Sequence, residues 1–127
     1  METYNSFLID THIFIWWMEG NPALSQEVYQ LITNPQNHIF LSVASIWEII
    51  IKKSRKKLKI PIELEESLTF SNFTPLAIQL SHILALEQLP LYHHDPFDRI
   101  LIAQAKTENF ILVTEDEKIK KYEIQII

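Results

Sequence analysis

Short, continuously apolar runs alternate along this chain with segments in which apolar residues recur at helical spacing. The runs at 7–9, 39–41 and 110–114 have the length of strands, and their lack of polar alternation is typical of strands buried on both faces. Segments 25–33 and 43–57 have helical periodicity instead. Because strands that alternate with helices usually form parallel sheets covered on both faces, the sequence predicts an α/β fold.

Further elements are expected around these runs, within one domain that spans residues 1–127. A chain of this length has the common size of a single domain, and its composition shows no interdomain linker. A short helix at 13–18 is stopped by Gly20 and Pro22. The other expected elements are helices at 62–73, 80–89 and 118–122, a helix that begins at Pro96, and strands at 75–78 and 124–127.

The residues that the chain lacks exclude several classes of site. It has no cysteine, which excludes disulfides and thiolate metal sites. Its single glycine, Gly20, excludes glycine-rich phosphate loops and dinucleotide fingerprints. The N-terminus has no basic signal-peptide region, and no apolar run approaches the roughly 20 residues of a transmembrane helix. We therefore expect a cytoplasmic protein without a membrane partner.

Two acids open the apolar helical segment that follows His93 and His94. Pro96 suits the first helical position and Asp95 is a favoured N-cap, so Asp95 and Asp98 should both lie near the positive end of the helix. Carboxylates gathered in this way can bind a divalent cation. The alternative is purely structural: Asp95 caps the helix, Asp98 occupies the capping-box position, and neither takes part in chemistry.

Three more acids can join this pair at one edge of the sheet. Asp10 and Asp116 each follow a predicted strand, at the end where ligands bind in open α/β sheets. Glu48 lies in the most apolar part of the helix at 43–57, where an isolated carboxylate would be costly to bury. Two of them have a structural alternative, because Asp10 can cap the following helix and Lys52 at i+4 can pair with Glu48.

Convergence of these carboxylates would favour a bound cation. Carboxylates within a few ångströms of one another repel, and without a cation some would take up protons. Oxygen ligands without cysteine point to Mg²⁺, or Mn²⁺, rather than Zn²⁺, and such sites commonly bind substrate phosphates. The predicted ligands are Asp10, Glu48, Asp98 and Asp116.

Four segments resemble the ordered motifs of PIN-domain ribonucleases, and most closely those of bacterial VapC-type toxins. They read Phe-Leu-Ile-Asp-Thr-His at 7–12, Ala-Ser-Ile-Trp-Glu-Ile at 44–49, Asp-Pro-Phe-Asp-Arg-Ile-Leu-Ile-Ala-Gln-Ala at 95–105 and Val-Thr-Glu-Asp at 113–116. The resemblance extends over essentially the whole chain. It implies a three-layer α/β/α PIN-like fold with a central parallel sheet of four or five strands, metal-dependent cleavage of RNA, a cognate antitoxin and a homodimer.

The resemblance also implies roles for individual residues. The acids of the family's metal site match Asp10, Glu48, Asp98 and, at the fourth position, Asp116. The supporting residues are Thr114, Thr11 and Asp95. The Thr114 hydroxyl could orient a carboxylate or a water. Related chains often carry a glycine after the basic helix, where this one has Arg55-Lys56-Lys57-Leu58, and this departure concerns the local loop rather than the acids.

Positive charge is concentrated in one segment although the formal net charge is -5. Six of the eleven lysine and arginine residues lie between positions 52 and 59. They could contact phosphates, or they could solvate the surface and complement the dipole at a helix C-terminus. Given the resemblance, we expect RNA contacts from Lys52, Lys53, Arg99 and His12.

The expected reaction is hydrolysis of an RNA phosphodiester by a water that a divalent metal orients and acidifies. A PIN-like binding module without catalysis is the alternative, because metal ligands do not prove turnover. A phosphoaspartyl enzyme is disfavoured, since Asp10 is followed by Thr11 and His12 rather than by the Asp-x-Asp pattern of that chemistry. Products with 5′-phosphate and 3′-hydroxyl ends would distinguish attack by water from attack by the RNA 2′-hydroxyl.

Overall fold

A computed structural model describes residues 5–55, 66, 68 and 72–127 of the chain. Most of the helix expected at 62–73 lies outside the described residues, as do Lys56, Lys57 and Lys59 of the basic segment. None of the helices in the described part is long and apolar enough to cross a membrane.

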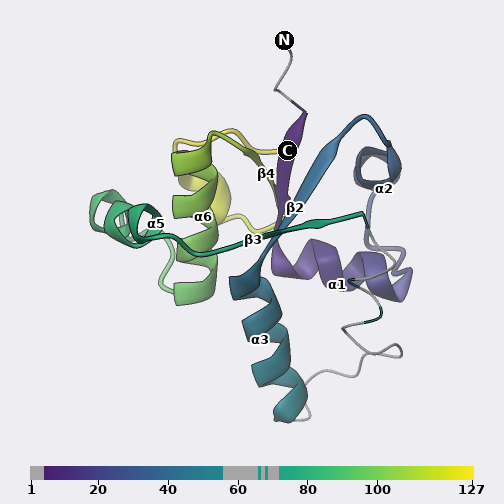
Figure 1. The fold of residues 1–127 in the computed structure, drawn as a ribbon, viewed down its shortest axis with the longest axis horizontal. Coiled ribbons are helices and arrows are strands. Elements are labelled where there is room, and N and C mark those ends of the chain that lie inside the picture. Colours follow the sequence, from purple (N-terminus) through teal and green to yellow (C-terminus); the bar gives the residue numbers. More distant parts are fainter. Residues whose placement is uncertain (1–4, 56–65, 67, 69–71) are drawn as a thin grey trace.

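The centre of the fold is a sheet in which every strand pairing is parallel (Figure 1). Its strands are β1 (Ser6–Ile9), β2 (His38–Ser42), β3 (Thr74–Leu76) and β4 (Ile111–Val113), in the spatial order β3-β2-β1-β4. Leu8 in β1 lies opposite Phe40 on one side and Leu112 on the other. This register brings the carboxyl ends of β1 and β4 to the same edge of the sheet.

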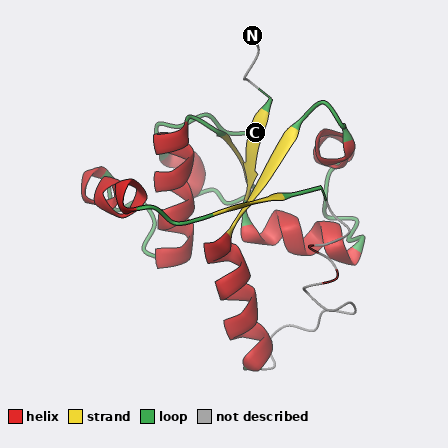
Figure 2. Ribbon diagram, viewed as in Figure 1, coloured by secondary structure: helices red, strands yellow, loops and turns green. Residues whose placement is uncertain are grey.

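The helices follow the strands in the alternation that the sequence predicts (Figure 2). They are α1 (Thr11–Glu19), α2 (Gln26–Thr33), α3 (Val43–Ser54), α5 (Leu80–Ala85) and α6 (Pro96–Glu108), with 3₁₀ turns η1 (Leu86–Gln88) and η2 (Ile119–Lys121). Side chains of Ser25 and Ser42 cap α2 and α3, accepting backbone N–H groups that the first helical turn leaves unpaired. Gly20, in the left-handed conformation, ends α1.

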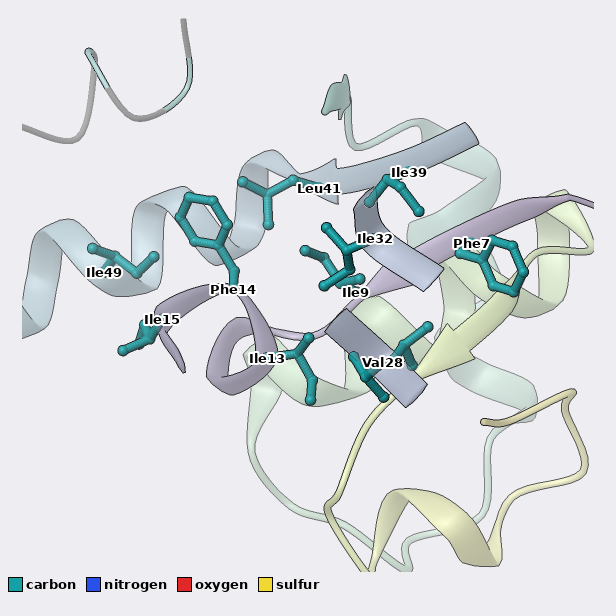
Figure 3. Packing of buried hydrophobic residues seen from close by; sticks show 11 residues of the cluster. Phe7, Ile9, Ile13, Phe14, Ile15, Val28, Ile32, Ile39, Leu41 and Ile49 are labelled. Atoms are coloured by element: carbon teal, nitrogen blue, oxygen red, sulfur yellow. The ribbon is translucent and has the colours of Figure 1, made fainter. Parts of the chain in front are cut away.

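Alternate residues of the strands pack into separate cores on the two faces of the sheet. Phe7 and Ile9 of β1 face α1 and α2, and Figure 3 shows this first core, which Ile49 of α3 joins. Leu8 faces the opposite way, against α6, η2 and the segment around α5. The helices therefore form layers on both faces, and the predicted three-layer α/β/α architecture with a central parallel sheet is confirmed.

Several expected elements differ in extent from those in the structure. The predicted helix at 80–89 divides into α5 and η1, and the carbonyls of Leu86 and Leu89 accept hydrogen bonds from the Arg99 guanidinium. The helix expected at 43–57 ends at Ser54, and the one at 118–122 is the single turn η2. The segment at 124–127 lies parallel to β4, and backbone hydrogen bonds join Gln125 and Ile127 to Leu112 and Thr114, but the pairing is limited to a bridge between Leu112 and Ile126.

Candidate metal centre

Asp10 leaves the carboxyl end of β1 and uses both carboxylate oxygens within the chain. Its Oδ1 accepts the backbone N–H of Ile13 at 2.9 Å, so Asp10 is the N-cap of α1. Its Oδ2 accepts a hydrogen bond from the hydroxyl of Thr114. The side chain is 3% exposed, which makes this a buried carboxylate at the edge of the sheet. The capping alternative is therefore correct in geometry, and it leaves further lone pairs of the carboxylate available.

Thr114 connects Asp10 to Asp116, the acid that follows β4 at the same edge of the sheet. Its Oγ1 also accepts the backbone N–H of Asp116 at 3.0 Å. The carboxylate of Asp116 is in turn fixed through Oδ1, which accepts the N–H groups of Lys118 at 2.8 Å and Ile119 at 3.1 Å. The two residues after β4 thus carry a hydroxyl and a carboxylate in a locally determined arrangement.

Asp95 and Asp98, which the sequence places together, have different surroundings. Oδ1 of Asp95 accepts the N–H groups of Phe97 at 2.8 Å and Asp98 at 3.1 Å, so Asp95 is the N-cap of α6. Asp98 lies three residues after Asp95, in the first helical turn, and its Oδ2 is 2.9 Å from Nε2 of His93. Asp95 therefore caps α6, and the Asp98 side chain lies in the cluster of acids.

Glu48 is buried in α3 with one oxygen paired and the other without a partner. Its Oε2 lies 2.9 Å from Nζ of Lys52, the i+4 pairing that the sequence allows. Its Oε1 is buried and has no hydrogen-bond partner among the described residues. An unpaired buried oxygen is costly unless another group, such as a cation, satisfies it.

His93 is a part of this cluster that sequence reasoning missed as a functional residue. Its Nε2 lies 2.9 Å from Asp98 Oδ2 and 3.2 Å from Asp116 Oδ2, and these three side chains have ligand atoms within 4.8 Å of one another. The sequence places His93 near Asp95, but nothing in it indicates that the ring meets an acid that follows β4. The His93 side chain is 10% exposed.

The pKa values of these acids reflect both their burial and the charges of their neighbours. Burial raises the pKa of Asp98 to about 7, and the charges of Asp95, Glu48 and Asp10 add to the rise while His93 opposes it. Burial also raises the pKa of Asp10, against hydrogen bonds from Thr114 and Ile13.

Asp116 behaves in the opposite way from those two acids. Partial burial acts to raise its pKa, but hydrogen bonds from the Ile119 N–H, His93 and the Lys118 N–H outweigh it, so the pKa lies below its ordinary value. The cluster thus combines one carboxylate stabilised as the anion with two whose charge is disfavoured, a conflict that a divalent cation would remove.

The donor set fits a hard divalent cation on these grounds. The charges of Asp10 and Glu48 both act on the Asp98 carboxylate, and Oε1 of Glu48 is buried without a partner among the described residues. Oxygen ligands of this kind suit Mg²⁺ or Mn²⁺.

The predicted supporting and RNA-contacting residues differ in burial. Thr11 is buried and donates its hydroxyl hydrogen bond to Ser45 Oγ at 2.8 Å, which joins α1 to α3. His12 and Lys53 are exposed, and the side chain of Lys52 is 36% exposed beside Glu48.

Arg99 differs from these residues because its donors are used within the chain. Its Nη1 donates to the carbonyls of Pro90 and His93 and to the Tyr122 hydroxyl, and its Nη2 donates to the carbonyls of Leu86 and Leu89. This guanidinium fixes the loop between η1 and α6, which is a structural reason for an arginine at this position.

The fold that carries this cluster is shared with a known protein family and with solved structures. The sequence model of the PIN domain matches residues 7–125. No curated protein matches the chain significantly.

Three solved structures share the fold at low sequence identity. VapBC2 from Rickettsia felis, bound to a DNA fragment from its promoter, has 18% identity and a TM-score of 0.69, with 96% of this chain and 97% of that chain covered. A toxin-antitoxin complex from Klebsiella pneumoniae has 22% identity and a TM-score of 0.67, with 94% of each chain covered. DNA-bound VapBC from Salmonella typhimurium has 18% identity and a TM-score of 0.69, with 96% of each chain covered.

Proposed function

We propose that this chain, which belongs to the PIN domain family, is a metal-dependent endoribonuclease and the toxin of a type II toxin-antitoxin pair. The family implies a nuclease, and the acids at the carboxyl edge of the sheet supply the site. The observation that carries the proposal is Oε1 of Glu48, which is buried and has no partner among the described residues. The charge of Glu48 acts on Asp98, whose pKa is raised by burial and by the neighbouring acids. A cluster of this kind is explained by a cation.

The proposed ligands are Asp10, Asp98 and Asp116, with Glu48 binding directly or through water. When bound there, Mg²⁺ or Mn²⁺ would supply an acidified water for in-line attack on a phosphodiester and would offset charge in the transition state. Thr114 fixes the positions of Asp10 and Asp116 relative to each other through the two hydrogen bonds of its hydroxyl. Thr11 fixes the start of α1 against α3 by its bond to Ser45.

Binding of the RNA backbone is assigned to cations near this edge. Lys52 and Lys53 lie in the last turn of α3, and Lys52 approaches the cluster through Glu48. Such contacts to phosphate provide affinity that weakens with salt. His12, exposed at the start of α1 and close enough to Asp10 to act on its charge, is a further proposed contact. This activity on cellular RNA would place the protein in the cytoplasm.

Cleavage of RNA with Mg²⁺, and with EDTA in its place, tests the proposal. Asp10→Asn and Asp98→Asn should abolish cleavage, whereas Glu27→Gln, which changes an exposed acid in α2, should not. The products should have 5′-phosphate and 3′-hydroxyl ends. Cyclic 2′,3′-phosphate ends would contradict hydrolysis by water. Equal cleavage by wild type and both site variants would identify contamination and would leave a catalytically silent binding module.

Protein partners are part of the same proposal. The solved relatives include toxin-antitoxin complexes, and exposed apolar side chains on this chain offer surface for a protein contact. They are Val43, Trp47 and Ile50 on α3 and Leu80, Ile83 and Leu84 on α5. We propose a homodimer and a cognate antitoxin. Light scattering of the purified chain tests the first. Coexpression with the product of a small reading frame immediately upstream tests the second.

A further inference from the structure

We propose that His93 is a positioning residue of the metal site, one that holds Asp116 by a hydrogen bond from its Nε2–H, lies in ion-pair contact with Asp98, and does not itself bind the metal. This inference rests on the proposed function, since it concerns the same cluster of acids. It assigns a role to a side chain that lies among the predicted ligands, with ligand atoms of all three within 4.8 Å of one another. The alternative is that His93 is itself a ligand of the metal.

The backbone of His93 is fixed from both sides by residues distant in the sequence. Its N–H donates to the Tyr122 hydroxyl at 2.9 Å, and that hydroxyl donates to the Pro90 carbonyl at 2.6 Å. Its carbonyl accepts from Nη1 of Arg99 at 3.3 Å. The loop before α6 is thereby held against the segment that follows β4, and the imidazole enters the cluster from a constrained position.

The orientation of the ring is set by a third backbone group. The N–H of Asp95 donates to Nδ1 of His93 at 3.2 Å. Because Nδ1 accepts this hydrogen bond, it carries no hydrogen, and the hydrogen of the neutral ring is on Nε2. The capping residue of α6 therefore fixes the tautomer of the histidine that precedes it.

A nitrogen that carries a hydrogen is a donor and has no free lone pair in the plane of the ring. Nε2 of His93 lies 3.2 Å from Oδ2 of Asp116, with which it forms a hydrogen bond, and 2.9 Å from Oδ2 of Asp98, which is an ion-pair contact without hydrogen-bond geometry. The hydrogen bond fixes the Asp116 carboxylate, and the polar ring edge beside Asp98 offsets part of the repulsion between the two acids. Binding of a metal by Nε2 would instead require the hydrogen on Nδ1, where the Asp95 N–H already points.

The lone pairs of Asp116 show that this arrangement leaves room for a cation. A carboxylate offers about four lone-pair positions. Oδ1 of Asp116 accepts two backbone N–H groups, and Oδ2 accepts from His93. One position on Oδ2 stays open. The Oδ2 of Asp98 lies 2.9 Å from Nε2 of His93 in an ion-pair contact, and neither oxygen of Asp98 accepts a hydrogen bond within the described part of the chain. Donors of this kind orient ligating carboxylates in metal sites.

Mn²⁺ is the probe that separates a positioning histidine from a ligating one. Pulsed electron paramagnetic resonance of Mn²⁺ bound to the wild-type chain detects a directly coordinated nitrogen. We expect no such ¹⁴N coupling. Calorimetric titration with Mn²⁺ then compares His93→Phe, which removes the donor, with His93→Gln, whose amide can place an N–H near the position of Nε2. The matched control is His94→Phe, which changes the adjacent exposed histidine.

Loss of an orienting partner typically weakens metal binding by about 10–100-fold, and we expect a loss of that size in His93→Phe. His93→Gln should retain most of the affinity, and His94→Phe should match wild type. Circular dichroism and thermal unfolding establish whether each variant is folded. If His93→Phe does not fold, the wild-type spectrum and the His93→Gln titration still decide the question.

Three results would overturn the inference, and they have different meanings. A ¹⁴N coupling in wild type that disappears in His93→Gln would make His93 a ligand. Unchanged Mn²⁺ affinity in folded His93→Phe would show that the acids do not need it. Absence of Mn²⁺ binding by the wild-type chain would instead contradict the proposed metal site itself, and with it the proposed function.

Discussion

The hydroxyl of Thr114 donates a hydrogen bond to Oδ2 of Asp10 and so joins the carboxyl ends of two neighbouring parallel strands. The same oxygen accepts the N–H of Asp116. Thr114 is fully buried, and water cannot replace either bond without entering the core. A single hydroxyl therefore determines the relative placement of two acids that are far apart in the sequence.

Replacement of this hydroxyl should destabilise the fold and the site together. Thr114→Val keeps the branched shape but leaves Asp10 Oδ2 and the Asp116 N–H without their partner. An unsatisfied buried polar group costs about 1–3 kcal/mol, and we expect a decrease of that size in the free energy of unfolding measured in urea. Thr114→Ser retains the hydroxyl and should lose less stability and keep metal affinity. Equal stability of the valine variant and wild type would argue against this bond.

Asp98 makes stability depend on pH in a direction that can be worked out. Burial raises its pKa from 3.8 to about 7, so the folded chain holds a proton that the unfolded chain has released in this interval. Stability is therefore unaffected by Asp98 below the unfolded value and falls as the pH rises toward the folded one. Asp98→Asn removes this penalty.

Thermal unfolding in EDTA measures the difference between wild type and Asp98→Asn. The two melting temperatures should be similar at about pH 4, and the variant should be the more stable at about pH 8. Added Mg²⁺ should reverse the order, since a ligand that binds only the folded state stabilises it. Glu27→Gln is the control for loss of an exposed acid. Lower stability of Asp98→Asn in EDTA at alkaline pH would mean that the contact with His93 outweighs burial.

The parts of the fold that the sequence predicts correctly are those with strong local causes. Continuous apolar runs become β1, β2 and β4, and Pro96 after Asp95 starts α6 at the expected residue. The segment at 124–127 is as apolar as a strand, yet it forms one bridge beside β4. Its extent depends on how the chain leaves η2, which no local pattern encodes.

The candidate site shows the same division between local and tertiary causes. Asp10, Asp98 and Asp116 are predictable because each stands at a strand or helix end that sequence can locate, and Glu48 because its carboxylate interrupts an apolar helical segment. His93 is not, because its role depends on a hydrogen bond to Tyr122 and on a carboxylate that follows another strand. For Arg99, sequence suggests a role that the fold does not require. Its position next to Asp98 in the sequence suggests an RNA contact, whereas its hydrogen bonds to loop carbonyls can be seen only in the folded chain.

Arg99→Lys separates these two explanations because it keeps the positive charge. Lysine lacks the planar fork that reaches several carbonyls at once. We expect the free energy of unfolding to fall by about 1–3 kcal/mol, together with weaker Mn²⁺ binding as the His93 loop loosens. Urea unfolding and calorimetry measure these effects. Unchanged stability with weaker RNA binding would show instead that the guanidinium contacts RNA.

Lys52 offers a direct test of whether the last turn of α3 contacts RNA. Its Nζ lies 2.9 Å from Glu48 Oε2 while the side chain is 36% exposed, so the cation is available both to the acid cluster and to an incoming phosphate. Loss of one phosphate contact to a single strand lowers the slope of log affinity against log salt by about 0.7. Lys52→Met should show this change, measured by fluorescence anisotropy with a labelled RNA and Ca²⁺ in place of Mg²⁺. Lys106→Met removes the same charge from the other end of α6 from Asp98 and should leave the slope unchanged. If both variants lower the slope equally, the effect belongs to net charge rather than to a contact at this site.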